Sequence, residues 1–184
     1  MKDKFKSYFP VILATLFCAA SFISGILLPD NISGKLLEIL KSYLGKISFS
    51  FWGIFLNNFT AATIIFLGGL IFALPSMISC YSNFVILGVT FKIFLKSAGL
   101  LKFFASILPH GIFEIPAIFI AFVLSLNIAS QIIRSILSIE SPGFLEVFKR
   151  SFLVFIKVVI PMLVIAALIE VYFTPWFLRY LGLL

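Results

Sequence analysis

Long stretches without a charged side chain constrain this chain more than any other feature. Uncharged runs cover residues 7–29, 47–91 and 158–169, and a further run, 103–133, holds one histidine and one acid as its only ionisable groups. A helix needs about 20 apolar residues to cross the hydrocarbon layer of a bilayer, so the longest run has room for two passes. With 62% hydrophobic residues, 11% charged residues and a mean hydropathy of +1.21, the chain is too apolar for a soluble domain. We predict an all-α, polytopic, multi-pass helical bundle of five or six spans in the cell membrane.

The basic residues indicate contact with lipid headgroups rather than with nucleic acid. The net charge is +7, but most of the lysines and arginines stand in groups of three at the ends of the apolar runs, as membrane-flanking charges do. The groups are nearly equal in size, so orientation depends on the first span, where Lys2, Lys4 and Lys6 favour a cytoplasmic N-terminus. We expect the lipid bilayer as one partner, protein partners or further copies of the chain as others, and no nucleic acid.

The order of segments predicts a single membrane domain, 1–184. Spans are expected at about 7–28, 49–74 and 150–173, the first of them too long for a cleaved signal peptide. Residues 32–47 carry apolar side chains at three- and four-residue steps between lysines, which predicts an amphipathic helix in the membrane interface, or alternatively a partner-binding helix. Residues 76–102 form a short span or a re-entrant half-helix, and 103–133 a broken span. The residues expected to break helices are Pro75, Pro109, Gly111 and Pro116.

Two ionisable residues, His110 and Glu114, lie within the 103–133 run, four residues apart and therefore on one face of a helix. An acid at mid-membrane costs roughly 2.5 to 3.5 kcal/mol on insertion scales, so Glu114 should be neutralised, paired or facing a polar cavity. A structural interpretation is a hydrogen bond between the two, or from His110 to carbonyls freed by the prolines. A functional interpretation is a proton relay, an ion site or a cavity gate.

The remaining polar residues of the spans favour one cluster. Glu170 follows Ala166 and Ala167, whose small side chains allow a close helix approach, and an acid there needs hydrogen-bond donors from other spans. For the asparagines, interhelical hydrogen bonding is the simpler interpretation. The predicted functional polar cluster consists of Asn57, Asn58, Asn83, His110, Glu114 and Glu170.

No catalytic residue, metal site or cofactor is predicted. A zinc protease needs a second histidine, which this chain lacks, and neither a Ser/His/Asp arrangement nor a glycine-rich phosphate loop is recognisable. Cys18 and Cys80 lie inside apolar runs, where a thiol behaves as a small hydrophobe, so we expect no disulfide and no metal bound to them.

The order of these motifs resembles the stage II sporulation protein M family, also known as domain of unknown function 95. The resemblance covers roughly residues 8–176, and its most specific part is the Pro-His-Gly-x-x-Glu-x-Pro pattern at 109–116. Departures are Phe84 and the stretch 121–124, where the family usually has glycine. The matching positions are Asn57-Asn58, Asn83 with Gly88, Leu108-Pro109-His110-Gly111, Glu114-Ile115-Pro116-Ala117, and Ala167-Leu168-Ile169-Glu170 with Pro175.

In spore-forming bacteria this resemblance implies a membrane scaffold that associates with two cell-wall-remodelling partners during engulfment of the forespore. Family members also occur where neither sporulation nor such a wall exists. We therefore expect a non-enzymatic scaffold or organiser of membrane partners. The alternative is a transporter or channel with a midplane polar site around His110, Glu114 and Glu170.

Overall fold

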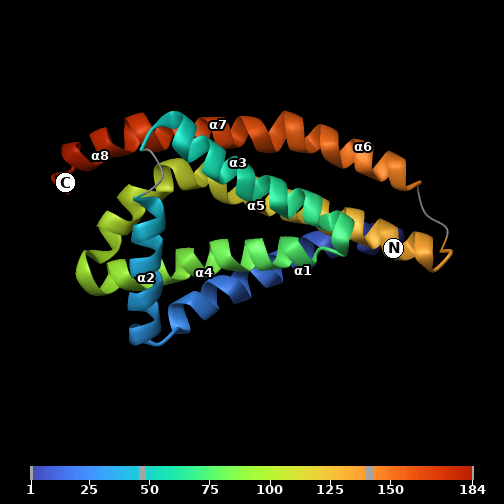
Figure 1. The fold of residues 1–184 in the computed structure, drawn as a ribbon, viewed down its shortest axis with the longest axis horizontal. Helices are drawn as coiled ribbons and strands as arrows, with labels where there is room; N and C mark the ends of the chain where they lie inside the picture. Colours follow the sequence, from blue (N-terminus) through green and yellow to red (C-terminus); the bar gives the residue numbers. More distant parts are fainter. Residues whose placement is uncertain (1, 46–48, 140–142, 184) are drawn as a thin grey trace.

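The computed structural model describes residues 2–45, 49–139 and 143–183, and within these ranges the secondary structure is entirely helical (Figure 1). Five of the helical segments are long and apolar enough to cross a membrane: Tyr8–Leu27, Phe51–Ile71, Leu74–Ser97, Gly99–Ile136 and Phe144–Tyr180. The chain is therefore a helical membrane protein, as the apolar runs predicted. The elements are α1 (Lys2–Leu27), α2 (Asp30–Leu44), α3 (Phe51–Leu67), η1 (Gly68–Ile71), α4 (Leu74–Ser97), α5 (Gly99–Ile136), α6 (Phe144–Val154), η2 (Phe155–Val159), α7 (Ile160–Leu168), η3 (Ile169–Phe173) and α8 (Thr174–Tyr180).

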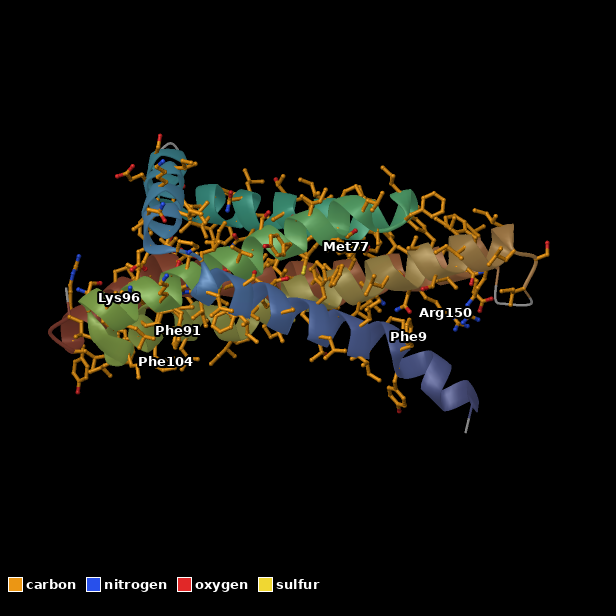
Figure 2. The ribbon with its side chains drawn as sticks, turned by 90° about the horizontal axis from the view of Figure 1, so that it is seen from below. Phe9, Met77, Phe91, Lys96, Phe104 and Arg150 are labelled. Atoms are coloured by element: carbon orange, nitrogen blue, oxygen red, sulfur yellow. The ribbon has the colours of Figure 1, made fainter. Side chains whose placement is uncertain are left out.

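Helix α5 is the centre of the bundle, because it contacts α1, α3, α4 and the elements from α6 to α8. The spans run side by side, and the two termini lie towards opposite ends of the molecule, as an odd number of crossings requires (Figure 1). Lys96 and Arg150 lie near opposite ends of the bundle, where each would meet a different membrane surface (Figure 2).

The sequence left the segment 76–102 open between a short span and a re-entrant half-helix, and the structure supports the span. Helix α4 has 24 residues, enough for a full crossing. It begins after a tight turn in which Phe72 and Ala73 adopt left-handed backbone conformations, with φ of 53° and 60°. Pro75 stands in the first turn of α4, where its missing N–H would have no helical partner. Pro75 therefore starts a helix and does not break one.

The prediction of a broken span at 103–133 is wrong. Helix α5 runs without interruption for 38 residues, with Pro109, Gly111 and Pro116 all inside it. Each proline removes one backbone donor and crowds the preceding turn, which bends a helix without ending it when neighbouring helices hold both halves. The ribbon of α5 changes direction in its yellow-green first half (Figure 1). The prolines therefore give α5 a bend rather than a break.

The last span is one long rod in which two wide, π-helical turns, η2 and η3, alternate with α-helix. Each wide turn ends two residues before a proline, Pro161 after η2 and Pro175 after η3. A π-turn lodges an extra residue in the helix and is frequent at functional sites. The rod begins at Phe144 and ends at Tyr180, so it extends beyond the predicted 150–173 at both ends.

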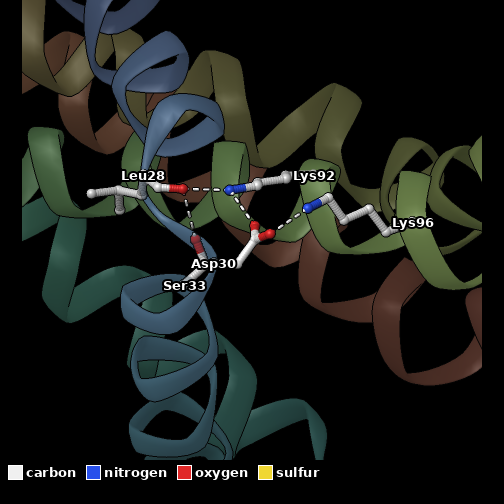
Figure 3. A network of polar contacts seen from close by, with 5 residues as sticks. All are labelled: Leu28, Asp30, Ser33, Lys92 and Lys96. Carbon is white, nitrogen blue, oxygen red and sulfur yellow. Dashed lines mark hydrogen bonds and ion pairs between the residues drawn. The ribbon is translucent and has the colours of Figure 1, made fainter.

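Helix α2 lies across the direction of the spans (Figure 1) and makes only sparse contacts with the other described helices. Its start is tied to α4 by ion pairs from Asp30 to Lys92 and Lys96, both 2.7 Å, while Lys92 also donates to the Leu28 carbonyl (Figure 3). Lys92, with a contribution from Lys96, lowers the pKa of Asp30 to about 2. The amphipathic helix predicted at 32–47 thus exists over Asp30–Leu44, while 46–47 lie outside the described residues. Its place in the membrane interface stays a prediction.

Two glycine-containing junctions bring helix backbones into close contact. At the crossing of α1 and α4, a Cβ on Gly25 or Gly88 would collide with backbone atoms of the other helix. At the other junction, a Cβ on Gly69 would lie 2.6 Å from the Ser125 carbonyl oxygen. Small residues give membrane helices the van der Waals contact that lipid cannot replace. Between the first pair of helices, the thiols of Cys18 and Cys80 face each other at 3.6 Å.

Candidate functional site

His110 and Glu114 line a pocket of about 210 Å³ between α4 and α5. Because α5 stays helical through both prolines, the two side chains lie one turn apart on the same face. Gly111 between them leaves space, since a Cβ there would meet only side chains of its own helix, at 3.4 Å or more. Helix α4 supplies the opposite wall with Asn83, Phe84, Ile86, Leu87 and Thr90.

Glu170 joins these two residues from the wide turn η3 of the last span. One nitrogen of His110 and one carboxylate oxygen each of Glu114 and Glu170 lie within 4.8 Å of one another. Ala166 and Ala167, one turn earlier, are fully buried and allow the rod to approach the bundle closely. The structure therefore brings together the histidine and the two acids that the sequence predicted as neighbours.

We call these three side chains the His–Glu–Glu group, and among the described residues none of them forms an ion pair. Nδ1 of His110 is buried without a hydrogen-bond partner. Within residues 2–45, 49–139 and 143–183, the ion pairs are those of Asp30 and Glu146, so neither Glu114 nor Glu170 is paired with a lysine or arginine. Two acids in an apolar layer without a positive partner require a proton or a bound cation to neutralise them.

Asn83 lines the same pocket in a fixed orientation. Its amide nitrogen donates to the carbonyl of Ser79 at 2.8 Å, one turn earlier on α4. The amide oxygen is therefore the end of Asn83 left for a ligand in the pocket. A spare acceptor beside two carboxylates adds to the preference of the pocket for a cationic or protonated group.

The other two predicted residues, Asn57 and Asn58, belong to different surroundings. Asn57 donates to the side-chain oxygen of Asn58 at 3.3 Å, and Asn58 is buried in the bundle. Asn57 lines a second pocket of about 370 Å³, whose other polar residues are Thr60 and Ser79. The six predicted residues thus do not form one cluster: Glu170 lies with His110, Glu114 and their pocket, whereas Asn57 and Asn58 lie apart from it.

Two threonines near the site were not predicted from the sequence. Thr90 lines the pocket of His110, and Thr174, one turn after Glu170, has a buried hydroxyl without a hydrogen-bond partner. A threonine in a membrane helix usually bonds to the carbonyl four residues earlier, as Thr15 does to Val11. Sequence alone therefore gives little reason to single out either residue. The one indication in the sequence was that Thr174 lies four residues after Glu170 and therefore on the same face of a helix.

The comparisons with known proteins agree with the motif order. The model of the family described as Stage II sporulation protein M matches residues 12–175. An uncharacterized protein of Methanocaldococcus jannaschii is 33% identical over 173 residues, which cover 94% of this chain and 97% of that protein. No solved structure matches the chain. The matched residues include every member of the His–Glu–Glu group.

Proposed function

This chain is a multi-pass membrane protein of the stage II sporulation protein M family, and from that premise we propose that it is a non-enzymatic organiser of partner proteins in the cell membrane. The proposal takes from the family the scaffold role that its motifs imply. It requires a stable bundle and a surface that a partner can reach.

The observation that carries the proposal is helix α2. This amphipathic helix packs sparsely against the spans. Its side chains Ile32 and Ile39 are therefore 47% and 66% exposed. The ion pairs of Asp30 hold its first turn against α4, so the position of α2 relative to the bundle is set at one end. A helix held in this way offers an apolar stripe both to the membrane surface and to another protein.

The bundle beneath α2 has the rigidity that a scaffold needs. Gly25 and Gly88 bring the backbones of α1 and α4 together, and Gly69 does the same for η1 and α5. Close backbone packing of this kind resists the sliding of helices past one another. This supports a platform rather than a moving carrier.

The alternative, a transporter or channel, is less favoured. Conduction requires a continuous path lined by polar groups. The pocket of His110 and the pocket of Asn57 share no lining residue, and Ser79 lines only the second of the two. This division argues for two local sites rather than one path.

Photo-crosslinking in native membranes tests the proposal. A photoreactive amino acid replaces Ile39 on α2, and a matched control replaces Leu16 on α1, which is 64% exposed. We expect discrete protein adducts from position 39 and lipid adducts alone from position 16. An adduct of twice the mass of the chain identifies a further copy as the partner. Absence of protein adducts along α2, or equal adducts at both positions, would contradict the proposal.

A further inference from the structure

We propose that His110, Glu114 and Glu170 bind a divalent first-row transition metal ion, of the manganese, iron or zinc type, inside the membrane-spanning bundle. This site goes beyond the scaffold function and does not depend on it. The metal would connect the bent part of α5 to the π-turn of the last span.

The geometry of the ligand atoms fits such an ion. Metal bonds to imidazole nitrogen and carboxylate oxygen are about 2.0–2.2 Å, so two ligands on a tetrahedral ion lie about 3.4 Å apart. The three ligand atoms lie within 4.8 Å of one another, which rotation of two flexible glutamate side chains can reduce to that spacing. His110 and Glu114 are one turn apart on α5, the helical spacing that directs two ligands at the same ion.

The charge of the group selects a divalent ion. Two carboxylates and a neutral imidazole carry a charge of −2, which a divalent cation balances, and an unbalanced charge in the low dielectric of the membrane is strongly unfavourable. The nitrogen ligand favours a transition metal over Mg²⁺ or Ca²⁺, which prefer oxygen. Sodium and potassium ions would leave one negative charge unbalanced.

Two further observations point to a ligand rather than to a structural hydrogen-bond network. The Nδ1 atom of His110 is buried without a partner, which is costly for a group that is only structural. The adjoining pocket has a volume of about 210 Å³, whereas a water molecule occupies about 30 Å³ of liquid volume, so waters that complete the coordination have space. Asn83 and Thr90 line this pocket, and the amide oxygen of Asn83, whose nitrogen is already bonded to Ser79, is an acceptor for such waters.

Manganese binding to the purified full-length protein in detergent tests the proposal. Mn²⁺ is the chosen probe because the thiols of Cys18 and Cys80, 3.6 Å apart, would attract zinc, whereas Mn²⁺ prefers oxygen and nitrogen ligands. After treatment with EDTA, Mn²⁺ is titrated and the free ion is counted by its electron paramagnetic resonance signal. We expect one ion per chain, a rise in the unfolding temperature on binding, and a coupling of the bound Mn²⁺ to a histidine nitrogen.

Single substitutions identify the ligands. His110→Gln, Glu114→Gln and Glu170→Gln should each weaken Mn²⁺ binding roughly tenfold or more, since even outer-sphere partners contribute that much. His110→Gln should also remove the nitrogen coupling. Glu38→Gln, the same chemical change at an exposed residue of α2, should bind as the wild type does. Unfolding in EDTA shows whether each variant is folded.

Three results would overturn the metal site. One is the absence of stoichiometric binding to the wild type. Another is wild-type binding without nitrogen coupling, and the third is an affinity equal to that of the wild type in all three folded variants. Each of these results would leave the scaffold proposal standing, because photo-crosslinking of α2 reports on a different part of the molecule.

Discussion

The junction of η1, α4 and α5 and the His–Glu–Glu group with its adjoining pocket are both polar regions inside an apolar bundle, but they differ in how their polar atoms are hydrogen-bonded. At the junction, Ser125 donates to Ser76 at 2.5 Å and Ser76 donates to the Ile65 carbonyl at 2.6 Å, with both serines fully buried. At the pocket, a buried nitrogen of His110 has no partner, and the two acids have no described ion pair. Groups that serve only packing are satisfied within the protein. The unsatisfied groups are the ones available to a ligand.

The largest effect expected from this comparison is at the junction, for Gly69→Ala. The added Cβ would lie 2.6 Å from the Ser125 carbonyl oxygen and 2.9 Å from its Cα, so η1 and α5 would have to separate. Overpacking typically costs about 1–3 kcal/mol, and backbone on both sides places this variant at or above the upper value. The measurement is unfolding in detergent, with Gly34→Ala as the control, because nothing lies within 4 Å of a Cβ there. Equal stability of the two variants would show that the junction is loosely packed.

The next effect distinguishes the two serines of the same junction. Ser76→Ala removes a donor to Ile65 and leaves the hydroxyl of Ser125 without its acceptor, whereas Ser125→Ala removes one donor alone. A lost hydrogen bond costs about 0.5–1.5 kcal/mol, and an unsatisfied buried group about 1–3 kcal/mol. We therefore expect Ser76→Ala to lower the free energy of unfolding by about 2 kcal/mol and Ser125→Ala by about 1 kcal/mol. The reverse order would mean that the bonds point the other way.

Sequence predicted the helices of both regions but not the difference between them. The length of the apolar runs and the positions of the charges were sufficient for the spans, because a bilayer fixes the minimum length of a helix. The prolines misled the prediction, since whether Pro109 and Pro116 end or bend a helix depends on neighbouring helices that hold α5 on both sides. The wide turns η2 and η3 were not predicted either, because one extra residue in a helical turn does not visibly change the spacing of apolar residues in the sequence.

The site was predictable to the extent that its residues share a helix face or adjoin small residues. His110 and Glu114 followed from their spacing, and the approach of Glu170 followed from Ala166 and Ala167, which are fully buried. The separation of Asn57 from this group did not follow, because position on α3 does not reveal which helix lies opposite. Three-dimensional packing decides which polar residues meet.

A smaller effect is expected at the pocket, where substitution should barely destabilise the metal-free protein. In EDTA, Glu114→Gln or Glu170→Gln replaces an acid that lacks an ion pair with an amide of similar shape, so each should be neutral or slightly stabilising. Once one acid is gone, the repulsion between the two is gone as well. The double variant should therefore deviate from additivity, with a coupling of about 0.5 kcal/mol, the low end of the range for residues in contact. Strictly additive unfolding free energies would place the acids in independent environments.

The smallest effect on stability is expected at Asp30. This residue is paired, unlike the acids of the His–Glu–Glu group, and exposed, unlike the serines of the junction. Lys92 and Lys96 lower its pKa from 3.8 to about 2 in the folded protein. A carboxyl with a depressed folded pKa contributes stability above its unfolded pKa and loses it as the pH falls through the folded value. Attachment of α2 should consequently be constant from pH 7 to 5 and weaken between about pH 4 and pH 2.

Hydrogen exchange of the α2 amides measures this, with Asp30→Asn as a variant that should exchange faster at pH 7 and show no further acid-dependent step. Because the Asp30 side chain is 69% exposed, water and salt screen its ion pairs, and only local opening of α2 should respond while the unfolding temperature of the bundle stays the same. An acid-induced change in α2 that persists in Asp30→Asn would assign the tether to other contacts, such as the bond from Lys92 to the Leu28 carbonyl.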